Sequence, residues 1–232
     1  WVAHAKWVLE QGAHYLSPFG TTGEALSVSV RERKRALEWL LLAGIPGDRL
    51  MPGVGVTALP ETLELARHAV ACGAAAVMAL PSFFYGATGD DGQARYFGEL
   101  IERTGSPALK VILYHIPQNA GVGISPALAA RLNKAYPETV VAYKDSGGDF
   151  THTQAVITAA PAISVFPGSE SFLTQGLAQG GAGCISATVN LNAGAIRAVY
   201  DGAMAGRHVS AADAPLNIFP KAVQEAGLHP AL

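Results

Sequence analysis

The feature that most constrains the fold is a regular alternation of short apolar runs and longer amphipathic segments. Most runs are too short for helices, contain Val or Ile and are flanked by Gly or Pro, which is typical of strands. Their polarity does not clearly alternate, which indicates strands buried on both faces, as in a parallel sheet covered by helices. The runs are residues 14–19, 51–56, 75–80, 110–116, 140–143, 163–166 and 183–187.

Segments with apolar residues at helical spacing lie between these runs. They are residues 2–11, 30–43, 60–72, 90–103, 125–135, 150–160, 171–180 and 193–205. No linker or low-complexity stretch separates one strand–helix unit from the next. The pattern therefore predicts a single α/β domain over residues 1–232.

The number of units favours a barrel. The chain opens on the helix predicted at 2–11, so we expect the strand before it to be absent. Eight units form a (β/α)8 TIM barrel, which is the predicted fold, without its first strand. The alternative is a doubly wound open sheet, which would usually carry G-x-G-x-x-G between an early strand and a helix; the sequence has no such motif.

Composition excludes several classes of protein. Half of the 232 residues are hydrophobic and only 15% are charged, which argues against a disordered chain. The formal net charge of −2 gives no reason to expect a nucleic acid or an anionic membrane as a partner. The first residues resemble neither a signal peptide nor a membrane span. Cys72 and Cys184 lack paired spacing, so we expect reduced thiols and a cytoplasmic protein.

Lys144 is the strongest catalytic candidate. Active sites of (β/α)8 barrels lie at the carboxyl ends of the strands, and Lys144 closes the run 140–143, where a barrel would point it inward. A buried ammonium is costly unless it is paired or its pKa is lowered. A lysine with a lowered pKa forms Schiff bases with carbonyl substrates. The alternative interpretation is a buried salt bridge with Asp145.

Tyr114 and a pair of threonines are further candidates. Tyr114, in the run 110–116, could move protons at a Schiff base, or it could be a half-buried packing residue. The adjacent His115 is expected to point to the other side of its strand, so it is not assigned as a base. Thr21 and Thr22 would offer hydroxyl and N–H groups to a carboxylate, or cap the next helix. The histidines lack metal-ligand spacing, so no metal is expected.

These motifs occur together in one family. The ordered set resembles the dihydrodipicolinate synthase / N-acetylneuraminate lyase family, and the resemblance covers essentially the whole chain. The motifs are GTTGE at 20–24, YHIP at 114–117, YKDSGGD at 143–149, FPGS at 166–169 and GGAGCIS at 180–186.

The resemblance implies a (β/α)8 barrel and a class I aldolase mechanism. Compared with the family, we expect part of the C-terminal helical region after Asn217 to be absent. Lys144 would attack the ketone of pyruvate or another 2-oxo acid, and the resulting iminium would act as an electron sink. Tyr114 would carry protons, with the Thr22 hydroxyl in its relay. The backbone N–H groups of Thr21 and Thr22 would hold the substrate carboxylate against the lysine, which makes the attack effectively unimolecular.

The same resemblance implies the surroundings of the site. Gly168 and Ile185 would line the pocket beside Lys144. Neither a metal nor an organic cofactor would be needed, because the substrate is activated as a covalent Schiff base. The partners would be a small-molecule 2-oxo acid and an aldehyde. The family is commonly tetrameric, so a homo-oligomer, a dimer or a homotetramer, is expected.

Two departures bear on the substrate. In dihydrodipicolinate synthases proper, an arginine five residues after the active-site tyrosine binds the second substrate's carboxylate; here that residue is Asn119, which has no charged fork. Those enzymes also place a neighbouring subunit's tyrosine in the relay, from the stretch that corresponds to residues 82–85. Phenylalanine there cannot pass protons, and Tyr85 could substitute.

Both departures favour an aldolase or lyase acting on a 2-keto-3-deoxy sugar acid or a related 2-oxo acid. The alternatives are dihydrodipicolinate synthase itself, joining pyruvate and aspartate semialdehyde in lysine biosynthesis, and a relative that dehydrates its substrate. A non-catalytic barrel that only binds a 2-oxo acid, or a phosphate-binding barrel, would also suit the fold.

Overall fold

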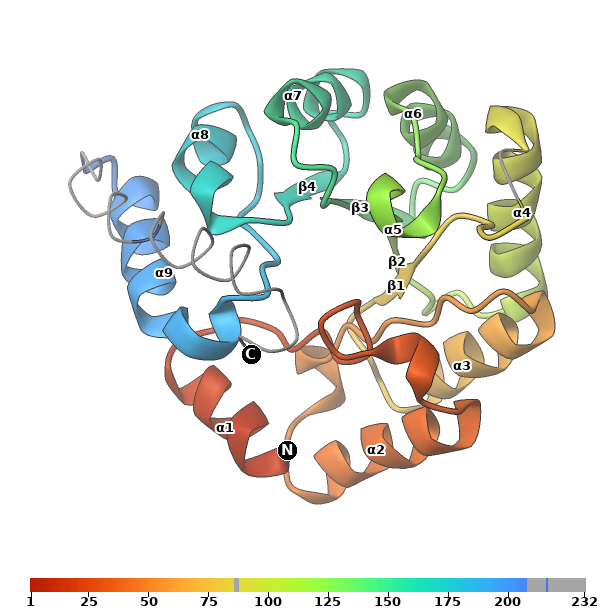
Figure 1. The fold of residues 1–232 in the computed structure, drawn as a ribbon, viewed down its shortest axis with the longest axis horizontal. Coiled ribbons are helices and arrows are strands. Elements are labelled where there is room, and N and C mark those ends of the chain that lie inside the picture. Colours follow the sequence, from red (N-terminus) through yellow and green to blue (C-terminus); the bar gives the residue numbers. More distant parts are fainter. Residues whose placement is uncertain (86–87, 208–215, 217–232) are drawn as a thin grey trace.

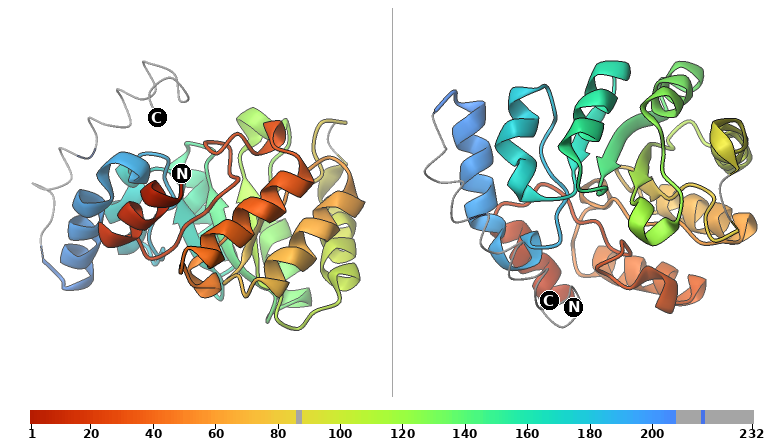
Figure 2. Two further views of the ribbon diagram at one scale, coloured as in Figure 1. Left: turned by 90° about the horizontal axis from the view of Figure 1, so that it is seen from below. Right: turned by 45° about the horizontal axis from the view of Figure 1, so that its top comes forward.

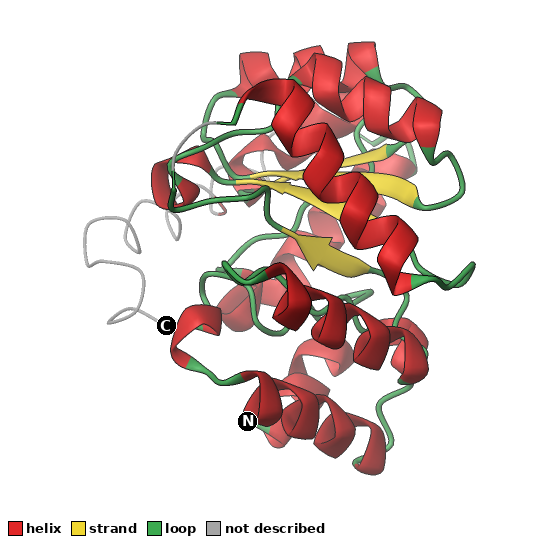
Figure 3. Ribbon diagram, turned by 90° about the vertical axis from the view of Figure 1, so that its right-hand side faces the viewer, coloured by secondary structure: helices red, strands yellow, loops and turns green. Residues whose placement is uncertain are grey.

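The computed structural model describes residues 1–85, 88–207 and 216. Its helices form a ring around a central sheet, and the first helix lies beside the last one (Figure 1). Seen from the side, helices lie above and below the strands (Figure 3). The predicted shortening after Asn217 lies outside the described residues. Within the described residues, no helix is long and apolar enough to cross a membrane.

Four parallel strands form the sheet in the order β1-β2-β3-β4. They are β1 (Val77–Ala79), β2 (Val111–His115), β3 (Val140–Asp145) and β4 (Ser164–Pro167). Helices connect successive strands, as parallel pairing requires. The prediction of parallel strands buried under helices is therefore confirmed for these four runs.

The helices follow the predicted segments closely. They are α1 (Val2–Glu10), α2 (Val30–Leu42), α3 (Leu59–Ala71), α4 (Gly89–Thr104), α5 (Pro117–Ala120), α6 (Pro126–Ala135), α7 (Phe150–Ala159), α8 (Leu173–Ala178) and α9 (Val189–Met204), with short 3-10 turns at Ala25–Ser27, Gly47–Arg49 and Glu170–Phe172. Ser29 and Glu32 form a capping box at the start of α2. The segment predicted as one helix at 171–180 is instead a 3-10 turn followed by α8.

Side chains alternate between the two faces of the strands, and this alternation separates two apolar cores. Val111 and Leu113 pack outward against the helices, whereas Ile112 and Tyr114 pack toward the middle of the ring. Successive residues of a strand point to opposite faces. Residues at the carboxyl ends of β2 and β3 therefore divide into an inner set and an outer set.

Three predicted strands are not strands in the structure. The runs 14–19 and 51–56 form only isolated parallel bridges, Leu16 with Leu50 and Gly53 with Met78. Pro18 and Pro52 lack an N–H group, so a continuous ladder cannot form there. On the other side of the sheet, the run 183–187 follows β4 through single hydrogen bonds, Ala182 N to Val165 O and Ile185 N to Pro167 O.

These pairings extend the sheet on both sides but leave the barrel open within the described residues. No described strand joins the segment after α1 to the segment before α9. The two helices that flank this opening, α1 and α9, lie side by side in both views of Figure 2. The neighbouring segments line the first cavity described below.

Candidate active site

Tyr114 and Lys144 face each other on neighbouring strands. They are register partners in the β2–β3 pairing, and both point toward the middle of the ring. Both side chains are buried. The Lys144 Nζ atom lies 4.2 Å from the centroid of the Tyr114 ring, a cation–π distance that offsets part of the cost of burying the ammonium. The sequence prediction of an inward-pointing lysine is confirmed.

The alternative of a salt bridge between Lys144 and Asp145 is wrong. Among the described residues, no carboxylate oxygen lies within 4.0 Å of Lys144 Nζ. The Asp145 carboxylate instead accepts hydrogen bonds from His152 and Thr153 of α7. Because adjacent strand residues point to opposite faces, Asp145 lies behind the sheet from Lys144.

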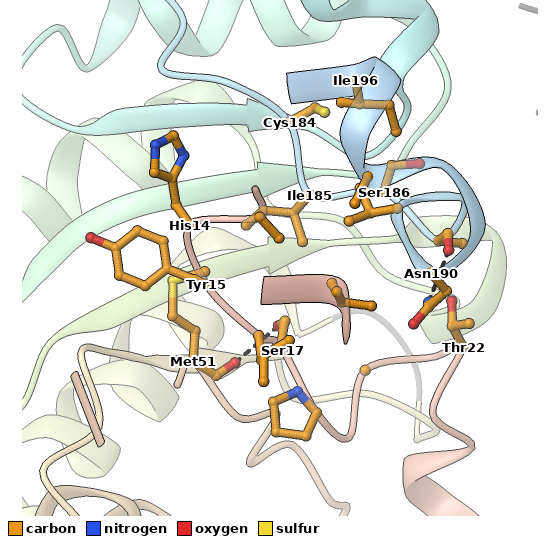
Figure 4. Close-up of a pocket in the computed structure, with 18 of the residues that line it drawn as sticks. His14, Tyr15, Ser17, Thr22, Met51, Cys184, Ile185, Ser186, Asn190 and Ile196 are labelled. Atoms are coloured by element: carbon orange, nitrogen blue, oxygen red, sulfur yellow. Dashed lines mark hydrogen bonds between the residues drawn. The ribbon is translucent and has the colours of Figure 1, made fainter. Parts of the chain in front are cut away.

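The hydroxyl of Thr21, and not that of Thr22, lies beside Tyr114. Thr21 Oγ1 and Tyr114 Oη are 3.0 Å apart, and either atom can be the donor. This corrects the predicted relay, which placed the Thr22 hydroxyl there. Thr22 lines the neighbouring cavity (Figure 4). The two threonines differ because they occupy a tight turn, in which Glu24 N donates to Thr21 O.

Close backbone packing holds this turn in place. Gly53 N donates to Pro18 O, and a Cβ atom at position 53 would lie 1.9 Å from Phe19 O. Only glycine allows two backbones to approach so closely. Phe19 and Glu24 have positive φ angles of 63° and 48°, so both ends of the turn are in a conformation that side chains disfavour. The surrounding contacts therefore fix where Thr21 lies.

A cavity of about 700 Å³ begins at these residues and runs toward the open side of the ring. Lys144, Thr21, Thr22, Phe166 and Ile185 line it. Figure 4 shows that it extends from Thr22 and Asn190 at one end to His14 and Tyr15 at the other. Its volume suits a small organic substrate. The prediction that Ile185 lines the pocket beside the lysine is confirmed.

Asn119 borders a second cavity of about 420 Å³, on the other side of Tyr114 and Thr21. This space is mostly apolar, with Glu24 and Asn119 among its few polar residues. Gly168 lines neither cavity, contrary to the prediction. A Cβ atom there would lie 2.3 Å from Ser146 Oγ, so this glycine serves close packing at the end of β4.

A buried carboxylate near the first cavity was missed from the sequence. Glu170 accepts hydrogen bonds from the hydroxyls of Ser186 and Thr188, and it is 3% exposed. These contacts tie the segment that carries Ile185 to the end of β4. All three residues lie at or just after the ends of predicted strands, but the sequence does not show that they pair across 16–18 positions.

A second missed group lies behind the sheet. His115 and Asp145 are register partners, one step beyond Tyr114 and Lys144. His152 Nδ1 donates to Asp145 Oδ2 at 2.9 Å, and its ring stacks on that of His115 with centroids 4.2 Å apart. The prediction that His115 points away from Tyr114 is confirmed. Sequence reasoning found no role for His152, which belongs to the next helix.

Burial and hydrogen bonds shift the pKa values in this group. Burial favours a neutral Asp145, but hydrogen bonds from His152, Gly147 and Thr153 outweigh it and lower the carboxyl pKa. The hydrogen bond to Asp145 is the largest cause that raises the pKa of His152. Burial lowers the pKa of His115. The pair Asp145–His152 is therefore ionised over a wider pH range than isolated side chains would be.

The same three residues are the group among the described ones that could hold a metal ion, with ligand atoms within 4.8 Å of one another. Their hydrogen bonds do not suit this role. His115 Nδ1 accepts from Ile124 N, so a neutral ring carries its proton on Nε2 and has no free lone pair. His152 Nδ1 faces a carboxylate and must carry a proton. Stacked rings also do not converge on one ion.

Replacing Asp145 with asparagine is expected to destabilise the protein by about 2 kcal/mol at neutral pH, because several hydrogen bonds to a buried charge are weakened. Since the folded-state pKa of Asp145 is depressed, its contribution is present above the ordinary value of 3.8 and lost as the pH falls through the lower folded value. Urea unfolding of both proteins across the acid range measures the difference. A difference that does not shrink in acid would contradict this account.

The chain is similar to proteins of one known family. The model of the Dihydrodipicolinate synthetase family matches residues 3–220. An uncharacterized DapA-like lyase of Chloroflexus aurantiacus is 33% identical over 229 residues, which cover 99% of this chain and 76% of the relative.

Two solved structures are also similar. Dihydrodipicolinate synthase from Agrobacterium tumefaciens has a TM-score of 0.82 and 31% identity, covering 85% of this chain and 69% of that one. The chloride-inhibited dihydrodipicolinate synthase from Acinetobacter baumannii, solved with pyruvate, has a TM-score of 0.84 and 26% identity, covering 97% and 75%. Motifs, fold and comparisons agree: the chain belongs to the Dihydrodipicolinate synthetase family.

Proposed function

We propose that this protein is a class I aldolase or lyase that forms a Schiff base between Lys144 and pyruvate or a related 2-oxo acid. The observation that carries the proposal is a buried lysine amine with no carboxylate partner among the described residues. It lies over the ring of Tyr114 and lines a cavity of substrate size. The family match and a relative solved with pyruvate support the same chemistry.

The neutral amine of Lys144 attacks the ketone carbon of the 2-oxo acid, and water leaves to give an iminium. This cation accepts the electron pair released when the neighbouring carbon loses a proton or when its bond to the aldehyde-derived carbon breaks. Tyr114 moves protons at this step, assisted by the Thr21 hydroxyl at 3.0 Å. The iminium is itself the electron sink, so the proposed reaction requires no metal or organic cofactor.

The turn at residues 20–24 holds the substrate carboxylate in this proposal. The backbone N–H groups of Thr21 and Thr22 serve as donors, and Ile185 covers the other side of the bound acid. A carboxylate held at this turn fixes the ketone carbon beside Lys144. This positioning can contribute several orders of magnitude to the rate.

The second substrate is an aldehyde without a second carboxylate, because position 119 offers no cation to bind one. Asn119 borders the cavity beside Tyr114, where it can hydrogen-bond to a hydroxyl or carbonyl group. This favours cleavage or formation of a 2-keto-3-deoxy sugar acid or a similar compound. Condensation of pyruvate with aspartate semialdehyde is the second candidate, favoured by the 31% identity to a dihydrodipicolinate synthase.

The protein is proposed to be a cytoplasmic homo-oligomer, a dimer or a tetramer. Phe84 and Tyr85 are 76% and 89% exposed at the tip of the loop after β1. Two adjacent aromatic rings in water are costly, and a second subunit would cover them. Cys72 and Cys184 are both free thiols, which suits a reducing compartment.

Trapping with borohydride tests the Schiff base directly. The protein is incubated with pyruvate and reduced, and its intact mass and peptide map are measured. We expect one pyruvate-derived adduct, on Lys144, that is absent from Lys144→Ala. Lys110→Ala is the matched control, because Lys110 precedes β2 on the same sheet and its amine is bound to Glu138 O at the protein surface.

An adduct on another lysine, or none with pyruvate or with longer 2-oxo acids, would overturn the proposal. The absence of any adduct would leave a barrel that binds a 2-oxo acid without reacting. Once the adduct is established, turnover with aspartate semialdehyde and with sugar-derived aldehydes separates the two substrate candidates.

A further inference from the structure

The carboxyl ends of β2 and β3, which carry Tyr114 and Lys144, are joined behind the sheet by a second pair of residues. In the register of β2 and β3, Tyr114 pairs with Lys144 and His115 pairs with Asp145. The first pair faces the cavity and the second faces helix α7. Any shift of Asp145 relative to His115 therefore also moves Lys144 relative to Tyr114.

Helix α7 holds the rear pair through one buried carboxylate. The Asp145 side chain is 1% exposed, and its Oδ2 atom accepts from His152 Nδ1 at 2.9 Å and from Thr153 Oγ1 at 2.8 Å. Its Oδ1 atom accepts from Gly147 N. The His115 ring is stacked on the His152 ring at an angle of 19°. These contacts hold together the end of β3, the turn that follows it and the His115 ring of β2.

We propose that the His152–Asp145 pair is a positioning element that holds the end of β3, and with it Lys144, in the geometry that the reaction requires. The proposal rests on the Schiff-base function proposed above. His152 touches neither cavity, so it acts through Asp145 and is not a catalytic residue. A backbone shift of about 1 Å at Lys144 can cost up to about 10²-fold in rate.

This pair also makes the rear of the site sensitive to pH, because His152 can lose its proton. The titratable groups that face His152 are Asp145 and Tyr143 of β3, His115 of β2 and Asp149 before α7. Burial and the nearby Asp145 raise the pKa of Tyr143 far above the working range, so Tyr143 stays neutral. Asp145 raises the pKa of His152, so the charge on His152 is present below the ordinary value of 6.5 and is lost as the pH rises through the raised value.

The variant His152→Gln tests the proposal. Glutamine keeps an N–H donor for Asp145 but carries no charge and does not titrate. The reaction is exchange of the pyruvate methyl protons for deuterium in D2O, followed by NMR, which requires the Schiff base but no aldehyde. We expect the maximal exchange rate to fall about tenfold at about pH 6, with little change in the pyruvate concentration for half-saturation.

The ratio of wild-type to variant rates removes every pH dependence that the two proteins share. This ratio is expected to shrink as the pH rises through the pKa of His152. The matched control is His68→Gln, because His68 and Glu38 form a pair of the same 2.9 Å length on helices α3 and α2, away from β3. Its rates should equal those of the wild type at every pH. Thr153→Val, which removes an uncharged partner of Asp145, should lower the rate without changing the pH dependence.

Three outcomes would overturn the proposal. Unchanged exchange in His152→Gln would show that the pair does not position Lys144. A fall that is the same at every pH would show that His152 only supports packing. Absence of exchange and of a trapped adduct in the wild type would overturn the Schiff-base function as well, which separates that failure from the first two.

Discussion

Replacing Tyr114 with phenylalanine is expected to lower the rate of pyruvate methyl proton exchange by about 10²- to 10⁴-fold, the range typical of a lost proton-transfer group. Phenylalanine preserves the ring over which Lys144 lies, so the amine keeps its cation–π contact and the fold is unaffected. Only the hydroxyl that contacts Thr21 is removed. The defect should therefore lie in proton transfer, while the iminium still forms.

Two measurements separate these steps. Borohydride trapping after long incubation should still give the adduct on Lys144, whereas proton exchange in D2O should be nearly lost. If Tyr114→Phe exchanged protons at the wild-type rate, another group would have to carry them. If the variant failed to form the adduct at equilibrium, the hydroxyl would be needed for binding instead.

The two threonines provide the finer test of the same relay. Thr21→Val removes the hydroxyl that lies 3.0 Å from Tyr114, and Thr22→Val is its matched control one residue along the same turn. Thr21→Val should reduce the exchange rate, as Tyr114→Phe does, but by a smaller factor. Thr22→Val keeps the backbone N–H group that is proposed to hold the carboxylate, so its exchange rate should stay close to that of the wild type. The reverse pattern would restore the assignment made from the sequence.

The residues on the inner face of the site could be predicted because side chains in a strand alternate between its two faces. Lys144 at the end of an apolar run had to point either into the ring or behind it, and the neighbouring Asp145 had to point the other way. The same reasoning correctly kept His115 out of the cavity. The four central strands were predicted from their short continuous apolar runs instead, which do not clearly alternate in polarity.

Other parts of the site follow no period and could not be predicted. Thr21 and Thr22 lie in a turn with residues of positive φ on both sides, where side-chain directions depend on backbone contacts with Gly53. The partners of Glu170 and Asp145 lie on other elements, so only the folded chain brings them together. Gly168 was given a place in the pocket on the basis of resemblance, but it packs against Ser146. Local sequence patterns thus predicted to which face of a strand a side chain points. Which residues contact one another in the site depended on long-range contacts.

The close approach at Gly53 leads to the second large expected effect. In Gly53→Ala the added Cβ atom would lie 1.9 Å from Phe19 O and 2.8 Å from the Phe19 carbonyl carbon, and both are backbone atoms. Backbone atoms cannot rotate away as a side chain can, so the segment before Thr21 must move. We expect the substitution to lower the free energy of unfolding by about 1–3 kcal/mol, as overpacking does elsewhere.

The same movement should affect the reaction, because the displaced segment carries Thr21. A shift of roughly 1 Å would break its contact with Tyr114, and the exchange rate should fall by up to about 10²-fold. Gly194→Ala in α9 is the control, since the nearest atom to its added Cβ is the flexible end of Gln11 at 3.4 Å and alanine favours the helix. Urea unfolding and proton exchange would be measured on both variants. A Gly53→Ala protein that unfolds and exchanges like Gly194→Ala would show that the turn at residues 20–24 is held by contacts other than this one.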